Sequence, residues 1–256
     1  MPLKILIVGG GSIGERHLRC FQNQPGVAVS LCEPHDDRRA AVVRRYGLSE
    51  SFVSFDSAAE QSWDAAVVCT PAHLHVEQAV ALLERTGALL IEKPLTTVGV
   101  PTDRLLAAAG GKTVGVAYTY RSHPAVRAVR HWIDAGRLGR VRQLAVLTGS
   151  HFPTFRPAYR DTYYASRETG GGAIQDAATH LFDLAHLMAG RFDWVFCDAG
   201  RQALRDVAVE DTVHVVARAA GESVMVSLTV NQFMAPFEVT MQINGDEASA
   251  RLSLHD

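Results

Sequence analysis

Hydrophobic residues in the first half of the chain gather in short continuous runs rather than at alternating positions. Each run is followed by a stretch with helical spacing. Repeated strand–helix–strand units predict an α/β fold with a parallel, doubly wound sheet, and continuous apolar strands are typical of a sheet with helices on both faces. The expected strand and helix pairs are Lys4–Val8 with Ile13–Asn23, Val27–Cys32 with Asp36–Tyr46, Ala65–Cys69 with His75–Arg85 and Ala88–Ile91 with Thr102–Ala109, followed by a strand over Thr113–Ala117.

The pattern changes after about Tyr120. A helix is expected over Pro124–Ala135, a strand over Val141–Thr148 and one long helix over Ala173–Met188. Later segments alternate with period two, which predicts a mainly antiparallel sheet with one buried and one more polar face. We therefore expect a first domain over residues 1–120 and an α+β domain over residues 121–256. The clearest alternation sets Val224, Val226, Leu228 and Val230 against Met225, Ser227, Thr229 and Asn231.

The charge of the chain argues against nucleic-acid and membrane partners. Its 256 residues carry a formal net charge of −2, and the arginines at 38, 39, 44 and 45 fit the polar face of one helix. No apolar run approaches the roughly 20 residues of a membrane span, and the first run is too short for a signal peptide. We expect a cytoplasmic protein.

The four cysteines have no spacing typical of a metal site. They fall on expected helix or strand positions, so we expect reduced and mostly buried thiols without a chemical role. These cysteines are Cys20, Cys32, Cys69 and Cys197.

A glycine-rich turn follows the first expected strand and opens the first helix. Its pattern is Gly9-x-Gly11-x-x-Gly14, with Ser12 and Ile13 between the last two glycines. Such a turn lets backbone N–H groups approach a pyrophosphate at a helix N-terminus. The alternative is a glycine-rich loop without a ligand. Because strand, helix and a following acidic residue all have the right order, dinucleotide binding is the favoured interpretation.

That acidic residue is Glu33, nineteen positions after Gly14 at the end of the second strand. A carboxylate there can accept both ribose hydroxyls of NAD and would repel the 2′-phosphate of NADP, so NAD is the expected cofactor. Arg38 and Arg39 are close enough in sequence to leave NADP open. The alternative is a solvated surface glutamate.

Two further segments follow strands at the ligand-facing end of the expected sheet. Thr70 and Pro71 precede His75, and we expect this segment to shape a nicotinamide pocket rather than to supply a catalytic histidine. Glu92, Lys93 and Pro94 end an apolar strand, and the proline constrains the backbone that aims the lysine. A desolvated lysine can share a proton with a substrate hydroxyl, whereas the alternative is a solvated turn.

The expected long helix supplies the partners of this lysine. Asp176 and His180 are four residues apart and share one helical face, with Asp183 nearby. A histidine oriented by a carboxylate is a sound general acid or base. The same spacing fits a plain polar pair or a metal site. Metal is disfavoured because two ligands and a lysine make a poor set, and no metal is expected.

The loop before the glycines at 170–172 is rich in arginine and tyrosine, which suit carboxylate, phosphate or sugar groups. Arg156, Arg160 and Tyr163 are the candidate substrate contacts. The alternative is that the aromatic residues pack between the domains and the arginines are solvated.

Together these motifs resemble the Gfo/Idh/MocA family of sugar oxidoreductases. The resemblance covers roughly residues 3–188, and it is the order and spacing of the motifs that make it specific. The matching features are the glycine turn, Thr70-Pro71 with His75, Glu92-Lys93-Pro94, Arg121 with Pro124, and the glycine-led helix with Asp176 and His180.

The resemblance implies a Rossmann domain joined to a domain whose open sheet often mediates oligomerisation, hence a homo-oligomer such as a dimer or tetramer. It implies hydride transfer between a nicotinamide and a carbinol carbon of a sugar, sugar nucleotide or polyol. Carried over by residue, Lys93 binds the reacting hydroxyl, Asp176 helps to place it and His180 exchanges its proton. Thr70, Pro71, His75, Glu92, Lys93 and Arg121 would border the cofactor.

Family members commonly run past this length, so further strands and a returning helix are expected beyond Asp256, and a missing sheet edge would expose unpaired strands. Two other readings remain. The chain could be a non-catalytic dinucleotide sensor or assembly subunit, or a glycosidase that oxidises and re-reduces its substrate transiently. The sequence leaves the sugar, the oxidised carbon and the physiological direction undetermined.

Overall fold

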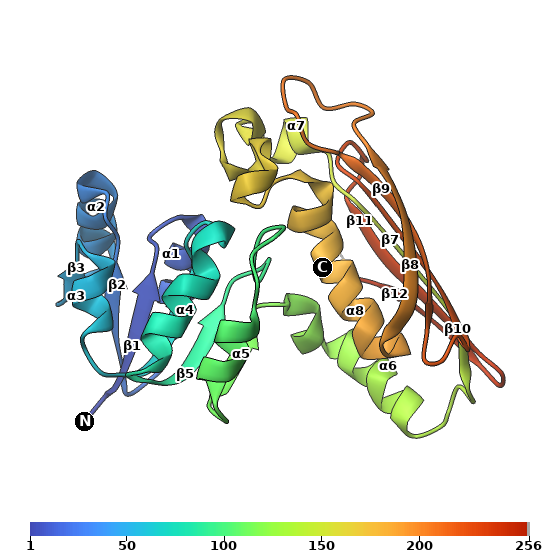
Figure 1. The fold of residues 1–256 in the computed structure, drawn as a ribbon, viewed down its shortest axis with the longest axis horizontal. Coiled ribbons are helices and arrows are strands. Elements are labelled where there is room, and N and C mark those ends of the chain that lie inside the picture. Colours follow the sequence, from blue (N-terminus) through green and yellow to red (C-terminus); the bar gives the residue numbers. More distant parts are fainter. Residues whose placement is uncertain (255–256) are drawn as a thin grey trace. The chain divides into compact units, whose positions relative to one another are not determined.

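The computed structural model describes residues 1–254 of the chain, which form two compact units. The first unit is Met1–Ala117 and the second begins at Tyr118. The division therefore comes three residues before the boundary expected from the sequence. Figure 1 shows the elements of each unit, and each unit is described by itself.

The first unit contains a parallel six-stranded sheet in the order β3-β2-β1-β4-β5-β6. The strand order reverses between β1 and β4, and ligands of open α/β sheets bind at the carboxyl ends of strands around such a reversal. The doubly wound parallel sheet predicted from the sequence is confirmed. Its strands are β1 (Leu3–Val8), β2 (Val27–Cys32), β3 (Ser51–Phe52), β4 (Trp63–Val68), β5 (Thr86–Ile91) and β6 (Thr113–Val116).

Side chains of β1 alternate between two hydrophobic cores, one for each face of the sheet. Leu6 and Val8 belong to one core, and Ile5 and Ile7 to the other. This double burial explains why the strand is a continuous apolar run. The covering helices are α1 (Ser12–Gln22), α2 (Asp36–Tyr46), α3 (Phe55–Ala59), α4 (His75–Leu83), preceded by the 3₁₀ turn η1 (Ala72–Leu74), and α5 (Asp103–Ala109).

The second unit contains a mixed six-stranded sheet in the order β12-β11-β7-β10-β9-β8. Neighbouring strands are antiparallel except β7 and β10, which are parallel, so the predicted mainly antiparallel sheet is confirmed. Its strands are β7 (Val141–Gly149), β8 (Phe192–Gly200), β9 (Thr212–Ala219), β10 (Val224–Asn231), β11 (Glu238–Gly245) and β12 (Ser249–Ser253).

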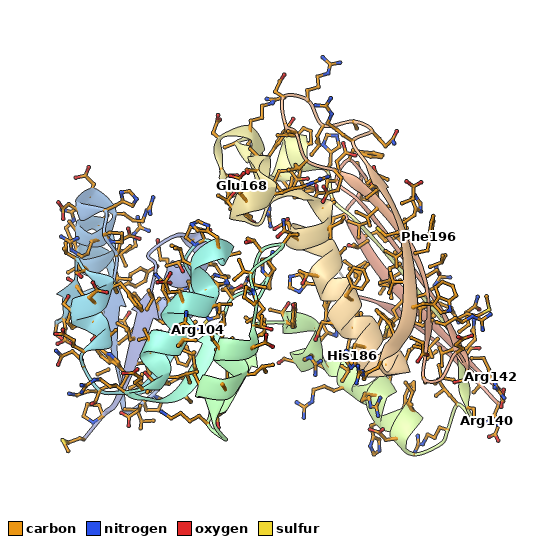
Figure 2. The ribbon with its side chains drawn as sticks, in the orientation of Figure 1. Arg104, Arg140, Arg142, Glu168, His186 and Phe196 are labelled. Carbon is orange, nitrogen blue, oxygen red and sulfur yellow. The ribbon has the colours of Figure 1, made fainter. Side chains whose placement is uncertain are left out.

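One face of this sheet packs on helices α6 (Pro124–Asp134) and α8 (Thr179–Ala189), as Figure 1 shows. The expected alternation holds along β10. Val226 and Leu228 are buried on one face of the sheet, whereas Met225 points to the other face and is exposed. The edge strand β8 is exposed along most of its length and carries Trp194. It also carries Phe196, which is labelled in Figure 2.

The expected single helix over Ala173–Met188 is wrong in detail. A π-helical segment, η6 (Ile174–Ala178), comes first, and α8 continues from Thr179. Asp176 lies in the wider π turn and His180 lies in the α-helix. Because π segments are rare and concentrate at functional sites, this break draws attention to the residues around it. Short helical turns precede it: η2 (Thr119–Ser122), α7 (Phe152–Phe155), η3 (Tyr159–Asp161), η4 (Tyr163–Ala165) and η5 (Arg167–Thr169).

The expectation of mostly buried cysteines is only half right. Cys32 and Cys69 are buried, and burial raises the pKa of the Cys32 thiol to about 11. Cys20 on α1 and Cys197 on β8 are exposed, because each lies on the outer side of its element. All four are free thiols.

No helix within residues 1–254 is long and apolar enough to cross a membrane.

Candidate functional site

The glycine turn between β1 and α1 combines two structural glycines with one that packing does not require. Gly9 has a positive φ of 98° beside the Cys69 carbonyl, and a Cβ at Gly14 would collide with the Gly9 carbonyl oxygen. A Cβ at Gly11 would meet nothing within 4 Å, and its φ of −68° suits any residue. The open space beside Gly11 is therefore available to a ligand at the N-terminus of α1.

Glu33 is not a solvated surface glutamate, because only 2% of it is exposed. One carboxylate oxygen accepts from the Gly10 amide at 2.8 Å, and the other accepts from the His35 amide at 2.9 Å. The Arg38 guanidinium lies 3.4 Å away, on the exposed side. The glycine turn thus holds the carboxylate at the end of β2, where it has lone pairs left for ribose hydroxyls.

His75 joins the end of β4 to the turn after β5. Its ring is 1% exposed, with Nδ1 2.9 Å from the Pro94 carbonyl oxygen and Nε2 2.7 Å from the Thr70 carbonyl oxygen. Burial lowers the pKa of His75, and the two carbonyl contacts oppose that shift. The ring therefore fixes the backbone of Thr70 and Pro94 and presents neither nitrogen to the outside. Pro71, at the start of the same segment, is exposed.

Lys93 lies in a turn organised by the residue before it. The buried Glu92 carboxylate accepts from the Lys93 amide at 3.0 Å and contacts His17 Nε2 of α1 at 2.8 Å. No local sequence pattern pairs His17 with Glu92, because 75 positions separate them. Its one available signal is its place one turn after Gly14 on the helix that opens at the glycine turn.

In the second unit Asp176 is buried, with 4% exposed, and lies among donors. Its carboxylate accepts from the Tyr163 hydroxyl at 2.7 Å and from the Arg156 guanidinium at 3.3 Å. Burial and the neighbouring Asp176 raise the pKa of Tyr163, so this hydroxyl stays protonated and donates. Two of the three candidate substrate contacts from the loop are thus brought together with Asp176.

The third candidate, Arg160, is directed elsewhere. Its guanidinium contacts the Arg205 carbonyl oxygen at 3.3 Å and Asp206 at 3.2 Å, and it lies over the Tyr159 ring. Arg160, in η3, therefore contacts the segment after β8 and does not join the Asp176 cluster.

The His180 ring lies beside two tyrosines that the sequence analysis did not select. The rings of Tyr118 and Tyr120 meet it edge to face, with centroids 5.8 Å and 5.6 Å away. The Tyr118 hydroxyl is 2.9 Å from the Thr179 hydroxyl. These aromatic walls restrict the orientation of the imidazole, and burial raises the pKa of Tyr120, which stays neutral.

Arg121, a candidate cofactor contact, forms a forked ion pair with Asp183 of α8. Its Nε lies 2.9 Å from both carboxylate oxygens, and a terminal nitrogen lies 2.7 Å from one of them. Asp183 therefore does not act as a second acid beside His180 but secures the segment that carries Tyr120 to α8.

A buried glutamate fixes the start of the π segment. Glu210 is 3% exposed, accepts from the Ile174 amide at 3.0 Å and receives two bonds from Arg167 at 3.0 and 2.9 Å. A side chain at Gly172 would collide with it. The glycines before Asp176 therefore let a carboxylate approach the helix start.

The residues of the glycine turn and the end of β2 suit a dinucleotide. A glycine turn with open space at Gly11, the N-terminus of α1 and the Glu33 carboxylate match the pyrophosphate and ribose of a nicotinamide dinucleotide. Within residues 1–254 no three His, Cys, Asp or Glu side chains are arranged to hold a metal ion.

Comparison with known families accounts for nearly the whole chain. Residues 3–120 match the family described as oxidoreductase family, NAD-binding Rossmann fold. Residues 126–251 match the GFO/IDH/MocA C-terminal domain. The two matches follow each other in the order of the two units.

Curated relatives are 26–31% identical to the chain over the residues that they align with. Levoglucosan dehydrogenase of Pseudarthrobacter phenanthrenivorans is 29% identical over 209 residues, which is 75% of this chain and 53% of that protein. Inositol 2-dehydrogenase of Rhizobium meliloti is 26% identical over 219 residues, 82% of this chain and 62% of that protein. The chain thus matches little more than half of the length of these relatives.

Solved structures share the fold. The WlbA dehydrogenase of Chromobacterium violaceum, in complex with NADH and UDP-GlcNAcA, has a TM-score of 0.88 at 23% identity, covering 99% of this chain and 74% of that one. Levoglucosan dehydrogenase in complex with NADH has a TM-score of 0.85 at 24% identity, covering 99% and 73%.

Proposed function

We propose that this chain, which belongs to the Gfo/Idh/MocA oxidoreductase family, transfers a hydride between NAD and a CH–OH carbon of a sugar, sugar derivative or polyol. Its NAD-binding Rossmann domain covers residues 3–120. The observation that carries the proposal is Lys93, held by Glu92 at the carboxyl end of β5, in a chain whose second unit presents Asp176 and His180. A basic group and an imidazole are what an alcohol oxidation needs to handle the departing proton.

The cofactor end of the proposal rests on the first unit. When bound, the nicotinamide supplies the hydride acceptor or donor. Gly9, Gly11, Ser12, Ile13 and Gly14 would meet the pyrophosphate. Glu33 would bind the ribose, which favours NAD, while Arg38 beside it leaves NADP open. Thr70, Pro71, Glu92 and Lys93 would border the nicotinamide, with His75 acting through the backbone it holds. Arg121 would contribute from the second unit.

The substrate end assigns a role to each polar group. Lys93 binds the reacting hydroxyl, Asp176 orients the substrate, and His180 takes the hydroxyl proton in oxidation or returns it in reduction. Arg156 and Tyr163 donate to the Asp176 carboxylate and border the substrate. Arg160 contacts Arg205 and Asp206 instead, so we assign it no contact with the substrate. The proposal requires Lys93 and His180 to reach the same substrate molecule.

The chemical class of the substrate is supported by the relatives. Proteins named levoglucosan dehydrogenase and inositol 2-dehydrogenase match most of this chain, and a structural neighbour binds UDP-GlcNAcA.

We extend the proposal to a homo-oligomer, a dimer or tetramer, formed through the outer face of the second sheet, where Val216 and Phe196 are exposed. A cytoplasmic location accords with four free thiols.

The proposal is tested by offering NAD or NADP with a panel that includes levoglucosan, myo-inositol and a UDP-linked amino sugar acid, and following formation of the reduced nicotinamide. The wild-type protein should convert at least one member. Lys93→Ala and His180→Ala should each lower kcat by about 10²-fold or more while NADH still binds. Wild-type turnover in either variant would sink the assignment.

The two other readings give different results. A dinucleotide sensor would bind NADH and turn over no member of the panel. A glycosidase would retain NAD, cleave glycosides and form no net NADH.

A further inference from the structure

One contact in the first unit joins the cofactor helix to the turn that carries Lys93. His17 Nε2 on α1 is 2.8 Å from one oxygen of Glu92, and the other oxygen accepts from the Lys93 amide at 3.0 Å. The Glu92 side chain is 9% exposed and that of His17 is 19% exposed. A single carboxylate therefore connects two backbone segments that are 75 residues apart.

We propose that His17 is a positioning residue for Lys93, acting through the Glu92 carboxylate. The inference rests on the proposed role of Lys93 and deepens it. His17 donates to Glu92 and fixes the rotamer of its carboxylate. The fixed carboxylate then holds the Lys93 N–H, and so the direction in which the lysine side chain leaves the backbone.

The ionic state of Glu92 supports this chain of contacts. Burial alone would raise the pKa of Glu92, but the bonds from His17 and the Lys93 amide and the charge of the Lys93 ammonium group hold it below its usual value. The ionised Glu92 carboxylate holds its two donors more strongly than a neutral carboxyl group would, because charge-assisted hydrogen bonds are stronger than neutral ones.

The other end of the same turn is held independently. The Pro94 carbonyl oxygen faces His75 Nδ1, whose ring is anchored at Thr70. His75 thus holds the Pro94 side of the turn, and the contact with His17 holds the Glu92 side. Removing the contact between His17 and Glu92 should weaken the hydrogen bond of the Lys93 amide while β5 stays folded.

The test compares three variants by amide hydrogen exchange, read residue by residue with NMR. His17→Gln keeps an N–H donor near the position of Nε2, whereas His17→Met has similar bulk and no donor. His186→Met, on an exposed position of α8, is the matched control for loss of a surface imidazole (Figure 2). Thermal unfolding shows that each variant is folded.

We expect His17→Met to lower the protection of the Lys93 amide about tenfold, with the amides inside β5 unchanged. His17→Gln should restore most of the protection, and His186→Met should alter nothing. With a substrate from the panel, His17→Met should lower kcat about tenfold and leave the NADH dissociation constant within about twofold. Retention of full Lys93 protection in His17→Met would overturn the inference, as would a His17→Gln variant as exposed as His17→Met.

Failure of the inference and failure of the proposed function are distinguishable. If the wild-type protein converts no sugar, the proposed function fails, while the exchange comparison still decides whether His17 holds the Lys93 turn. If it converts a sugar and Lys93 protection is insensitive to His17, only the positioning role is lost.

Discussion

Asp176 shows at the scale of single residues how a buried charge is stabilised in this protein. A carboxylate with 4% exposure needs donors, and Tyr163 and Arg156 supply them. The sequence singled out all three residues because their types suit sugar and anion binding. It could not assign the partners, because the 13 and 20 positions between them are bridged by several short helical turns whose geometry has no sequence period.

The Tyr163–Asp176 bond gives the first prediction. Tyr163→Phe removes one donor from a buried carboxylate and should lower kcat/KM about 10- to 100-fold, since the carboxylate loses orientation. Tyr46→Phe is the matched control, because the Tyr46 hydroxyl donates to Glu15 at the same 2.7 Å in the first unit. Steady-state kinetics on the converted sugar decides between them. Equal, small effects on kcat/KM in both variants would show that the Tyr163 hydroxyl does not orient the Asp176 carboxylate for catalysis.

At the scale of elements, the β1–α1 turn separates packing from ligand binding within one motif. Its glycine pattern was readable from sequence, because the spacing and the flanking strand and helix are local. The sequence does not show which of these glycines has no room for a side chain, because the atoms that crowd Gly9 and Gly14 belong to Cys69 and Gly9. The π segment was missed for a similar reason, because its start is set by the distant Glu210.

Two alanine substitutions in that turn should therefore behave differently. Gly11→Ala meets open space and should fold with a normal Tm, but weaken NADH binding at least about tenfold by filling the approach to the helix N-terminus. Gly14→Ala collides with the Gly9 carbonyl and should lower stability by about 2 kcal/mol or more. Nicotinamide fluorescence and thermal unfolding report the two effects. Unimpaired NADH binding by Gly11→Ala would argue against the pyrophosphate site.

The connection between β8 and β9 gives a pH-dependent prediction. The buried Asp211 carboxylate accepts from the amides of Gln202, Ala203 and Leu204 and from the Thr212 hydroxyl. Burial opposes ionisation, but these donors lower the pKa of Asp211 below its usual value. Its stabilising effect is therefore present above the unfolded pKa of about 3.9 and is lost as pH falls through the lower folded pKa.

Asp211→Asn should lower the free energy of unfolding by about 2–4 kcal/mol at neutral pH, because an amide nitrogen faces N–H donors. The difference from wild type should narrow as pH falls below about 4, because unfolding of the wild type then takes up a proton at Asp211. It should be smallest below the lowered folded pKa, where both side chains are neutral. Urea unfolding at several pH values measures it. A difference that stays constant down to pH of about 2 would show that the charge is not what matters.

At the scale of the whole molecule, both fold classes and the order of the elements were predictable from the sequence, because continuous and alternating hydrophobic runs distinguish a doubly covered sheet from a singly covered one. β2 and α2 were bounded correctly at Val27–Cys32 and Asp36–Tyr46. The parallel pairing of β7 with β10 could not be foreseen, since no local pattern records which strand lies beside which. The same limit hid His17, Tyr118 and Tyr120.

The exposed outer face of the second sheet makes the oligomer testable. Val216→Glu and Phe196→Glu place charges on paired positions of β9 and β8. Both should shift the protein to the monomer in light scattering coupled to gel filtration, because a desolvated charge opposes association. His186→Glu, an exposed substitution on α8, which packs on the other face of this sheet, should leave the oligomer intact. A wild-type monomer would contradict the proposed assembly.

Isotope transfer shows whether a hydride passes between a nicotinamide and a CH–OH carbon. The sugar or polyol that NAD oxidises would be supplied with deuterium on its carbinol carbon, and the reduced cofactor would be weighed by mass spectrometry. Deuterium should appear in the NADH formed by the wild-type protein, and Lys93→Ala should form no deuterated NADH. Substrate oxidation that leaves the cofactor unlabelled, or no oxidation of any carbinol despite NADH binding, would contradict it.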